Sequence, residues 1–312
     1  MITVPHRRGG SPSPAPERLG ESCMANKKKN NFTTVLLVLI LIAGLSLLLY
    51  PPISNYWNSF RQSEVISNYA DEMNNMDSEQ YAQLLEDAYN YNQTLPGRKN
   101  PYLLSEEQKL EYEQLLNVIG TGMMGYIEIP SIQSSLAIYH GTSDAVLQIA
   151  VGHLEWSSLP VGGENTHCVL SAHRGLPSAK LFTDLDQVEI GDVFMLRILD
   201  EIFTYEVDQI LVVEPHETES LLMEEGKDYC TLITCTPYAI NTHRLLVRGH
   251  RIENSLEARN IRLTSEAIQI EPLLVAPIVA APVLLLLLIG LMIPKKPKQA
   301  PELPDNTDDT PI

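Results

Sequence analysis

Cysteine is scarce in this chain of 312 residues, which contains four: Cys23, Cys168, Cys230 and Cys235. Small secreted domains that depend on disulfides carry many more cysteines in a short sequence, so the chain is not a disulfide scaffold. Three of the four lie between two long apolar segments, so at least one of these three is unpaired. An unpaired thiol is either buried and inert or retained for its reactivity.

Positive charge is also scarce, but only in the middle of the chain. Residues 51–271 contain 13 Lys and Arg against 33 Asp and Glu, a net charge of −20, whereas residues 1–31 contain six basic and two acidic residues. Nucleic acids need cationic partners for their phosphates, so nucleic acid is excluded as a partner of the middle region. Internal repeats of the common solenoid lengths are absent as well.

Charge is missing altogether from two apolar segments. Residues 32–50 and residues 272–293 are 19 and 22 residues long, close to the ~20 that a spanning helix needs. Lysines precede the first segment and follow the second, at positions Lys27, Lys28, Lys29, Lys295, Lys296 and Lys298. The positive-inside rule then predicts a two-pass protein of the cell membrane, with both termini cytoplasmic and residues 51–271 outside. A cleaved signal peptide over 32–50 is the alternative, but no small-residue cleavage site follows Tyr50.

Composition divides the rest of the chain. We expect residues 1–31 to be a disordered cytoplasmic N-terminus, and we suspect that translation starts at Met24 and omits residues 1–23. The other expected parts are a helical region at 51–124 with a loop around 94–104, a β-rich domain at 125–255, a juxtamembrane linker at 256–271 and a cytoplasmic tail at 294–312.

Residues 54–92 contain no Pro or Gly. Apolar residues recur there at helical spacing, which predicts two helices. Ser105 and Gln108 are spaced as a capping box and predict another short helix. From Gly125 onward the chain consists of β-rich runs separated by Gly, Pro, Asn or Asp at about the ~8–12-residue spacing of an all-β sandwich or barrel. We also expect short helices between strands over Asp144–His153 and Thr218–Glu225.

A β-rich run in the stretch Tyr229–Tyr238 (YCTLITCTPY) ends at Cys235, and Pro237 follows soon after it. Strand ends are where a barrel presents side chains to a groove, so Cys235 is the best candidate for a reactive thiol. Cys168 and Cys230, inside their runs, fit the pattern of small buried hydrophobes.

Strand alternation points Cys230 and Cys235, five residues apart, to opposite faces. This geometry opposes a disulfide between them and a zinc site that would add His243 and His250, and CxxC spacing is also missing. We therefore expect neither a metal nor a cofactor.

A nucleophilic thiol needs a base or a cationic neighbour, because the thiolate is the reactive form. Among eight histidines, His173 stands out because it ends the run Val169–His173 and precedes a Gly-Leu-Pro turn. The residues alone leave the other histidines open as the base. Arg244 lies nine residues beyond Cys235, a hairpin's distance, and can return beside it. An arginine cannot act as a base, but it can donate hydrogen bonds to an oxyanion.

These blocks resemble the signature of the sortases, specifically the class C, pilus-assembling branch. The stretch Thr231–Arg251 (TLITCTPYAINTHRLLVRGHR) resembles that family's cysteine block, and Ser171–Leu185 resembles its histidine block. The stretch Tyr89–Leu95 and the second apolar segment are also typical of the class, and the resemblance runs from about residue 60 to 255. It implies a mainly β fold: an eight-stranded sortase β-barrel with short helices, an N-terminal helical and lid segment and two flanking transmembrane helices.

The resemblance also implies the catalytic set His173, Cys235 and Arg244. Cys235 would attack the Thr–Gly bond of an LPxTG-like sorting signal in a pilin or surface protein, and a pilin lysine amine would accept the acyl group. Three further residues are candidates for the substrate groove, namely Leu232, Thr234 and Thr236. The alternatives are a sortase that attaches surface proteins to the cell wall, an exported cysteine hydrolase and a non-catalytic surface-binding module.

Class C sortases carry an Asp-Pro-aromatic lid whose Asp pairs with the catalytic Arg. The matching segment here is Asn100-Pro101-Tyr102. Because Asn cannot ionise, the resemblance implies a neutral hydrogen bond to Arg244 in place of an ion pair, with Tyr102 over Cys235. We expect a more readily opened lid; an ordinary surface loop without a gating role is the alternative.

Overall fold

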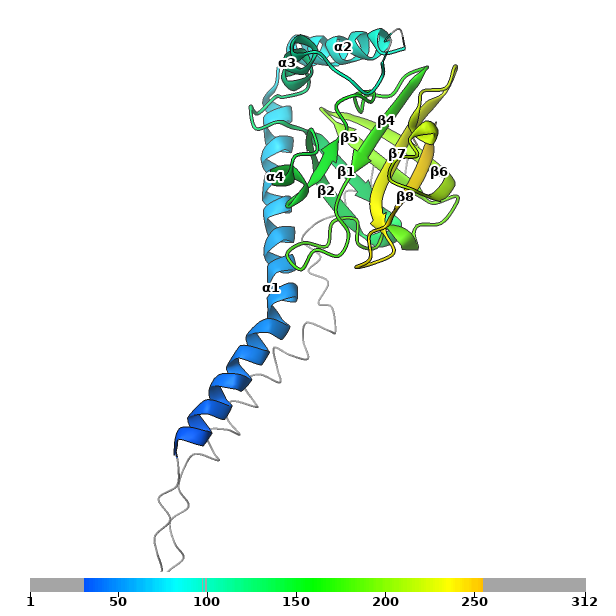
Figure 1. Cartoon of the computed structure of the whole chain (residues 1–312). Coiled ribbons are helices and arrows are strands. Elements are labelled where there is room, and N and C mark those ends of the chain that lie inside the picture. Colours follow the sequence, from blue (N-terminus) through cyan, green and yellow to red (C-terminus); the bar gives the residue numbers. More distant parts are fainter. Residues whose placement is uncertain (1–30, 97, 99, 255–312) are drawn as a thin grey trace, which may run out of the picture.

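The computed structural model describes residues 31–96, 98 and 100–254. The second apolar segment (272–293), its flanking linker and tail, and the N-terminal residues 1–30 lie outside the described residues. A closed β-barrel forms the body of the described part, and three helices precede it along one side and across one end (Figure 1).

Eight strands close the barrel in the order β1-β2-β3-β4-β7-β8-β6-β5, which confirms the predicted mainly β fold. Neighbouring strands are antiparallel except in the pairs β2–β3 and β4–β7, which are parallel. The strands are β1 Met123–Ile129, β2 Ser134–His140, β3 Val151–His153, β4 Thr166–Ser171, β5 Val193–Ile198, β6 Glu201–Val213, β7 Asp228–Thr236 and β8 His243–Ile252.

The helix predicted over Asp144–His153 is wrong in its second half. Helix α4 covers Asp144–Leu147, and the chain then enters the three-residue strand β3. A strand this short has no periodicity to detect; its pairing with β2 and β4 determines its conformation. The other short helices are 3-10 turns: η1 Pro130–Ile132, η2 Leu185–Gln187 and η3 Glu219–Leu221, the last inside the predicted Thr218–Glu225.

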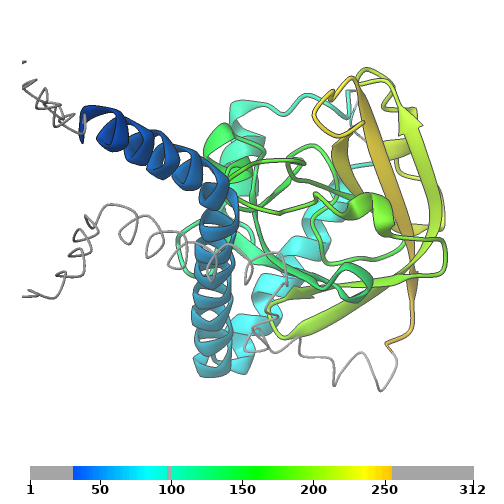
Figure 2. The ribbon, with the colours of Figure 1, turned by 90° about the horizontal axis from the view of Figure 1, so that it is seen from below.

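Helix α1 covers Asn31–Asn75 and continues through Pro51 and Pro52 instead of ending with the apolar segment at Tyr50. Its first half is exposed, and the helix is long and apolar enough to cross a membrane. Its second half runs along one side of the barrel, as Figure 2 shows from below. Together with α2 (Ser78–Thr94) it accounts for the two helices predicted over residues 54–92.

Two buried side chains fix the second half of α1 to the barrel. Tyr69 donates a hydrogen bond to the carbonyl of Met124 and accepts one from the amide of Leu199, at 2.9 and 2.7 Å. The Gln62 side-chain oxygen accepts a hydrogen bond from the Ala137 amide, and its side-chain nitrogen donates one to the carbonyl of Ile149. Gln62 thus satisfies backbone groups where β3 is too short to pair with the whole of β2.

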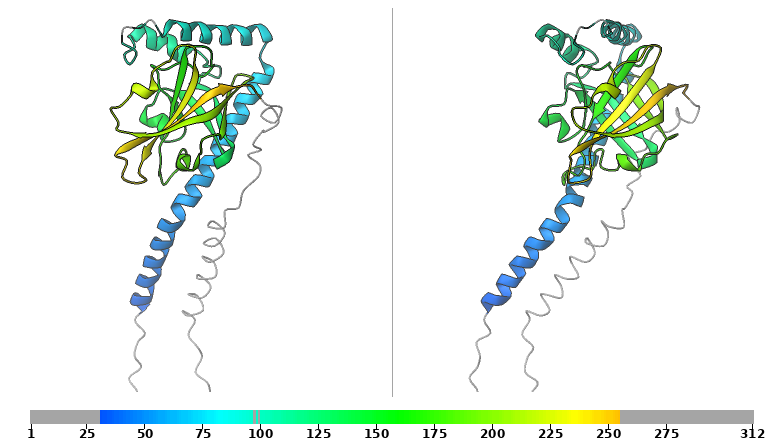
Figure 3. Two further views of the ribbon diagram at one scale, coloured as in Figure 1. Left: turned by 90° about the vertical axis from the view of Figure 1, so that its right-hand side faces the viewer. Right: turned by 45° about the vertical axis from the view of Figure 1, so that its right-hand side comes forward.

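Helices α2 and α3 (Glu106–Gln114) lie across the end of the barrel opposite the apolar half of α1 (Figure 3). Ser105 and Gln108 form the predicted capping box at the start of α3. On α2, the buried Asn92 side chain makes two hydrogen bonds to the backbone of Leu159, at 2.7 and 3.1 Å. These contacts hold the N-terminal helices on the barrel that carries the site.

Candidate active site

Three neighbouring strands, β4, β7 and β8, bring the predicted catalytic residues together. Cys235 on β7 is the direct cross-strand partner of Arg244 on β8. On the other side of β7, the parallel register pairs Ser171 with Ile233, and the Ala172 amide extends the ladder by donating to the Ile233 carbonyl at 3.1 Å. His173 lies two residues beyond Ser171, just past the end of β4, and continuing this register would bring it level with Cys235. The three residues therefore form one row across adjacent strands.

The row lies on the outer face of the barrel. Alternate residues of β7 point inward, so Cys230 and Leu232 lie in the main core. The side chains that alternate with these point outward, and on β4, β7 and β8 they form a separate outer cluster that includes Val169, Ile233 and Leu246. Cys235 and Arg244 share this outer parity, and both are only partly buried. The thiol at the strand end is thus accessible, as its place in the sequence predicts.

Two of the three groove candidates face the wrong way. Leu232 is fully buried in the core, and the buried Thr234 hydroxyl donates to the Ala172 carbonyl at 2.8 Å. Both have the inward parity of β7, so they support the strand from inside instead of lining a groove. Thr236 is only partly buried, next to Cys235, and stays a candidate.

A second arginine stands beside the row, and the sequence argument missed it. Arg174 follows His173, and its side chain is 8% exposed and forms an ion pair with Asp186. Its guanidinium donates to the Thr236 hydroxyl at 3.2 Å. Arg244 donates to the carbonyls of His243 and Asn241 at 3.1 and 3.4 Å. The Arg174 guanidinium thus contacts the residue that follows the reactive cysteine, and the Arg244 guanidinium caps carbonyls at the end of the loop that follows β7. The signal was available, because Arg174 directly follows His173 at the end of the histidine block's strand.

The lid segment lies on the outer cluster. The Tyr102 ring contacts Trp156 edge-on, with centroids 5.0 Å apart, and its hydroxyl accepts a hydrogen bond from Thr218 at 3.0 Å. Trp156 packs in turn against the outer cluster. The Asn100 side chain accepts from the Tyr102 amide at 3.1 Å. Within residues 31–96, 98 and 100–254, the hydrogen bonds of Asn100 and Arg244 do not join these two residues, so the segment is held through Tyr102.

Cys168 and Cys230 are register partners on β4 and β7 and are buried in the main core. Burial raises the pKa of the Cys230 thiol well above its ordinary value, which keeps it protonated. His153 lies in the same core and is held by the Tyr112 hydroxyl at 2.9 Å. These residues are packed away from solvent, in agreement with the structural role expected for both cysteines. In the described part of the chain, His, Cys, Asp and Glu do not gather in threes as a metal site requires.

Several known proteins resemble this chain in sequence and in fold. The family model of the sortase domain matches residues 127–252. Sortase C1 from Streptococcus agalactiae is 48% identical, with a TM-score of 0.60 over 62% of this chain and 100% of that one. Sortase C of Streptococcus pneumoniae, whose structure is described in terms of catalysis and pilin substrate specificity, is 46% identical, with a TM-score of 0.56 over 61% of this chain and 97% of that one.

A curated relative, sortase D of Bacillus subtilis, is 31% identical over 131 residues, which are 41% of this chain. The match spans 63% of that relative's length, somewhat under two thirds. The region matched by the family model includes His173, Cys235 and Arg244. The chain therefore belongs to the sortase family, whose members are cysteine transpeptidases, and its solved neighbours include class C sortases.

Proposed function

We propose that this chain is a membrane-anchored transpeptidase that cleaves an LPxTG-like sorting signal between Thr and Gly and joins the acyl group to a pilin lysine. One observation carries the proposal: an accessible thiol and an arginine are cross-strand partners on β7 and β8, and a histidine follows the end of β4, the strand on the other side of the thiol. The similarity to sortases that are described as acting on pilins supports the choice of substrate.

In the first half-reaction the Cys235 thiolate attacks the threonine carbonyl carbon. Negative charge develops on the carbonyl oxygen, and Arg244 donates hydrogen bonds to it. The bond from carbon to the glycine nitrogen then breaks as the His173 imidazolium gives its proton to the departing amine. A thioester to Cys235 remains.

In the second half-reaction a lysine amine of another pilin attacks the thioester carbon. Neutral His173 accepts the proton of the amine, and the Cys235 thiolate leaves. The product is an isopeptide bond between two pilins, and the enzyme returns to its starting state. Water in place of the amine would give simple hydrolysis.

The apolar half of α1, which is long and apolar enough to cross a membrane, supports the proposed anchoring. A substrate that is itself held in the same bilayer meets the enzyme at a raised effective concentration. The two-pass topology, with both termini in the cytoplasm and the catalytic domain outside, is part of this proposal, together with the second apolar segment.

The test is to incubate purified full-length chain with a purified pilin that ends in an LPxTG-like signal. A ladder of covalent oligomers is expected, and Cys235→Ala should abolish it, whereas Cys168→Ala, the control at a buried thiol, should not. Transfer to short wall-type peptide amines without a ladder would instead identify a sortase that attaches proteins to the cell wall. Cleavage that ignores every added amine would identify a hydrolase.

A further inference from the structure

Helix α1 carries aromatic residues directly after its apolar half. Tyr50, Tyr56, Trp57 and Phe60 are each more than half exposed. Aromatic side chains gather at the level of the lipid headgroups, where one end is apolar and the other meets water. If α1 spans the bilayer, this level therefore lies at about residues 50–60 of α1.

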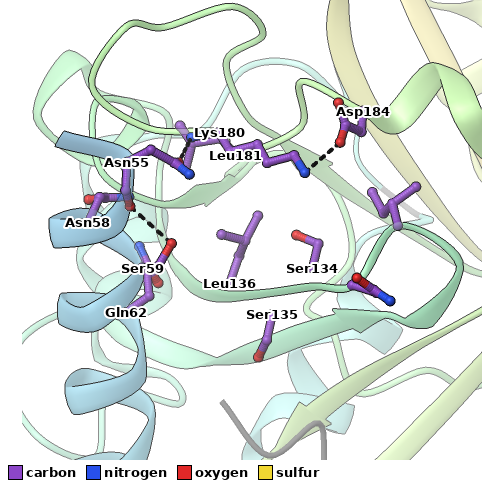
Figure 4. A pocket seen from close by; sticks show the side chains of 12 residues that line it. Asn55, Asn58, Ser59, Gln62, Ser134, Ser135, Leu136, Lys180, Leu181 and Asp184 are labelled. Carbon is purple, nitrogen blue, oxygen red and sulfur yellow. Dashed lines mark hydrogen bonds and ion pairs between the residues drawn. The ribbon is translucent and has the colours of Figure 1, made fainter. Parts of the chain in front are cut away.

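The same turns of α1 hold the loop that follows His173. The Ser54 hydroxyl donates to the carbonyl of Ser178 at 3.2 Å, and the Asn55 side chain accepts from the Lys180 amide at 2.7 Å. Figure 4 shows Asn55 beside Lys180 at the rim of a small polar cavity of about 90 Å³ between α1 and the barrel. Asn55 is only ~8 Å along the helix axis from Tyr50, at 1.5 Å per residue. The loop is thus fixed at the headgroup level.

This loop in turn supports the loop between β7 and β8. The Tyr238 ring packs on Gly175, where an added Cβ would come within 2.9 Å of the ring. The Arg174 guanidinium lies 5.9 Å from the centre of the same ring. Tyr238 and Ile240 are both more than half exposed. In Figure 1 the β7–β8 turn lies at the end of the barrel toward which the apolar half of α1 runs, away from α2 and α3.

These two loops carry no acidic side chain, although the domain as a whole is acidic. Residues 172–183 and 236–244 contain no Asp or Glu, although residues 51–271 contain 33. Their cations are Arg174, Lys180 and Arg244, of which the first two pair with Asp186 and Asp184 just beyond the first loop. An anionic lipid surface repels an acidic domain and tolerates only such acid-free, basic and apolar segments. The two loops at the membrane end meet this requirement, and so does the stretch 88–105 at the opposite end, so it is the position of the loops next to the apolar half of α1 that singles them out.

We propose that the barrel end that carries His173 and Cys235 rests on the lipid surface, with Tyr238 and Ile240 in the interfacial layer. The proposal rests on the membrane anchoring of the proposed function. It makes the bilayer one wall of the active site, so that the enzyme takes up the scissile bond at the level of the headgroups.

Full-length protein in nanodiscs of phosphatidylcholine and phosphatidylglycerol tests this contact. A tryptophan placed by Ile240→Trp is compared with one placed by Leu110→Trp, an exposed position on α3 at the far end of the barrel. Trp57 and Trp156 give the same background in both variants. Lipids brominated near the headgroup are expected to quench the added emission of Ile240→Trp and to leave that of Leu110→Trp unchanged.

Equal emission of Ile240→Trp in brominated and plain lipids would overturn the proposal. Emission that changes only when purified pilin is added would also overturn it, because the loop would then be a protein-docking surface. The readout needs no catalysis and can be repeated with Cys235→Ala, so failure of the proposed reaction would leave it intact.

A second measurement uses Ile240→Glu, which adds an acid to the acid-free loop. Its rate on a bilayer-embedded substrate should fall several-fold, while a soluble peptide is cleaved at the wild-type rate. Equal loss on both substrates would contradict a lipid contact, because it would locate the defect in the reaction itself.

Discussion

At the scale of single residues, the position of Arg244 depends on a backbone ladder and not on a flexible loop, because Arg244 is the cross-strand partner of Cys235. Arg244→Lys keeps the charge but loses the planar set of donors that an oxyanion requires. We expect kcat for peptide cleavage to fall by about 10²–10³, the usual effect of removing one oxyanion donor. Steady-state kinetics with a fluorogenic sorting-signal peptide measures this.

Arg248→Lys is the matched control for Arg244→Lys. Arg248 lies on the same strand with the same parity, but it pairs with Asp208 at 3.0 Å, away from the row. The control should keep kcat close to wild type. An equal loss in both variants would mean that the effect comes from the strand and not from an oxyanion contact.

His167 predicts a pH dependence of stability. Its Nδ1 lies 3.0 Å from the Leu222 carbonyl and its Nε2 lies 2.7 Å from the Thr231 hydroxyl, which suits the neutral ring. Burial, with the nearby Arg248 charge, lowers the pKa of His167 below 6.5. The unfolded chain therefore takes up the proton first, and this contribution to stability, complete above pH 6.5, is lost as the pH falls toward the folded-state pKa.

His167→Gln should accordingly lower the melting temperature at pH 7.5 but flatten its decline between about pH 6.5 and 5. Differential scanning fluorimetry over that range measures both effects. His216→Gln is the control, since the His216 side chain is exposed, and it should keep the wild-type slope. A wild-type slope in His167→Gln would refute the assignment.

The reactive residues were easier to predict than their surroundings. Cys235 was singled out by its place at a strand end, and Arg244 by its spacing from Cys235, but only the family resemblance separated His173 from the other histidines. The contact from Arg174 to Thr236 joins residues 62 apart in the chain, so it depends on the parallel pairing of β4 with β7. The groove roles given to Leu232 and Thr234 failed because both residues have the same strand face as the buried Cys230, and this alternation was applied to the cysteines but not to their neighbours.

At the scale of elements, the lid segment is held by two contacts of Tyr102. The edge-on contact with Trp156 contributes ~0.5–1.5 kcal/mol, and the hydrogen bond from Thr218 contributes about the same. Tyr102→Ala removes both, so we expect kcat/KM for a soluble sorting-signal peptide to rise, by roughly fivefold or more if opening limits access. Thr218→Val removes only the hydrogen bond and should give a smaller rise.

A Tyr102→Ala variant no faster than wild type would show that the segment is an ordinary surface loop. Asn100→Asp tests the missing lid carboxylate separately. An aspartate at position 100 would accept a stronger hydrogen bond from the Tyr102 amide and could also attract Arg244. The variant should therefore cleave the peptide no faster than wild type.

Elements with strong local signals were predicted well. The capping box at Ser105 starts α3, and seven β-rich runs correspond to seven of the strands. Strand β3 was missed because three residues cannot show a period, and its structure depends on partners in β2 and β4. The continuation of α1 through Pro51 and Pro52 also escaped prediction, since the apolar pattern changes there while the helix does not.

At the scale of the whole molecule, α1 has two separable parts. Removal of residues 1–53 should leave the fold and soluble-peptide cleavage nearly intact, because the contacts of α1 with the barrel begin at Ser54. Removal of residues 1–77 also deletes Gln62 and Tyr69. Loss of a fully buried aromatic side chain costs about 3–5 kcal/mol, so this shorter chain should melt many degrees lower or fail to fold.

Thermal unfolding of the two truncated chains by circular dichroism makes the comparison. Equal melting temperatures would mean that the second half of α1 is dispensable. A large drop in the melting temperature of the chain that lacks only residues 1–53 would mean that the apolar half of α1 also supports the barrel.

The closure of the barrel limits how a peptide can be recognised. Many domains bind an extended peptide by adding it as a strand to an open sheet edge, where backbone groups supply affinity with little regard to sequence. Here β5 returns to β1 and completes the ring, while Gln62 occupies backbone groups beside the short β3. A guest chain therefore finds no long free edge to pair with. Selectivity for a short motif then has to come from side chains and loops around the reactive sulfur, which makes loop exchange the direct route to changing it.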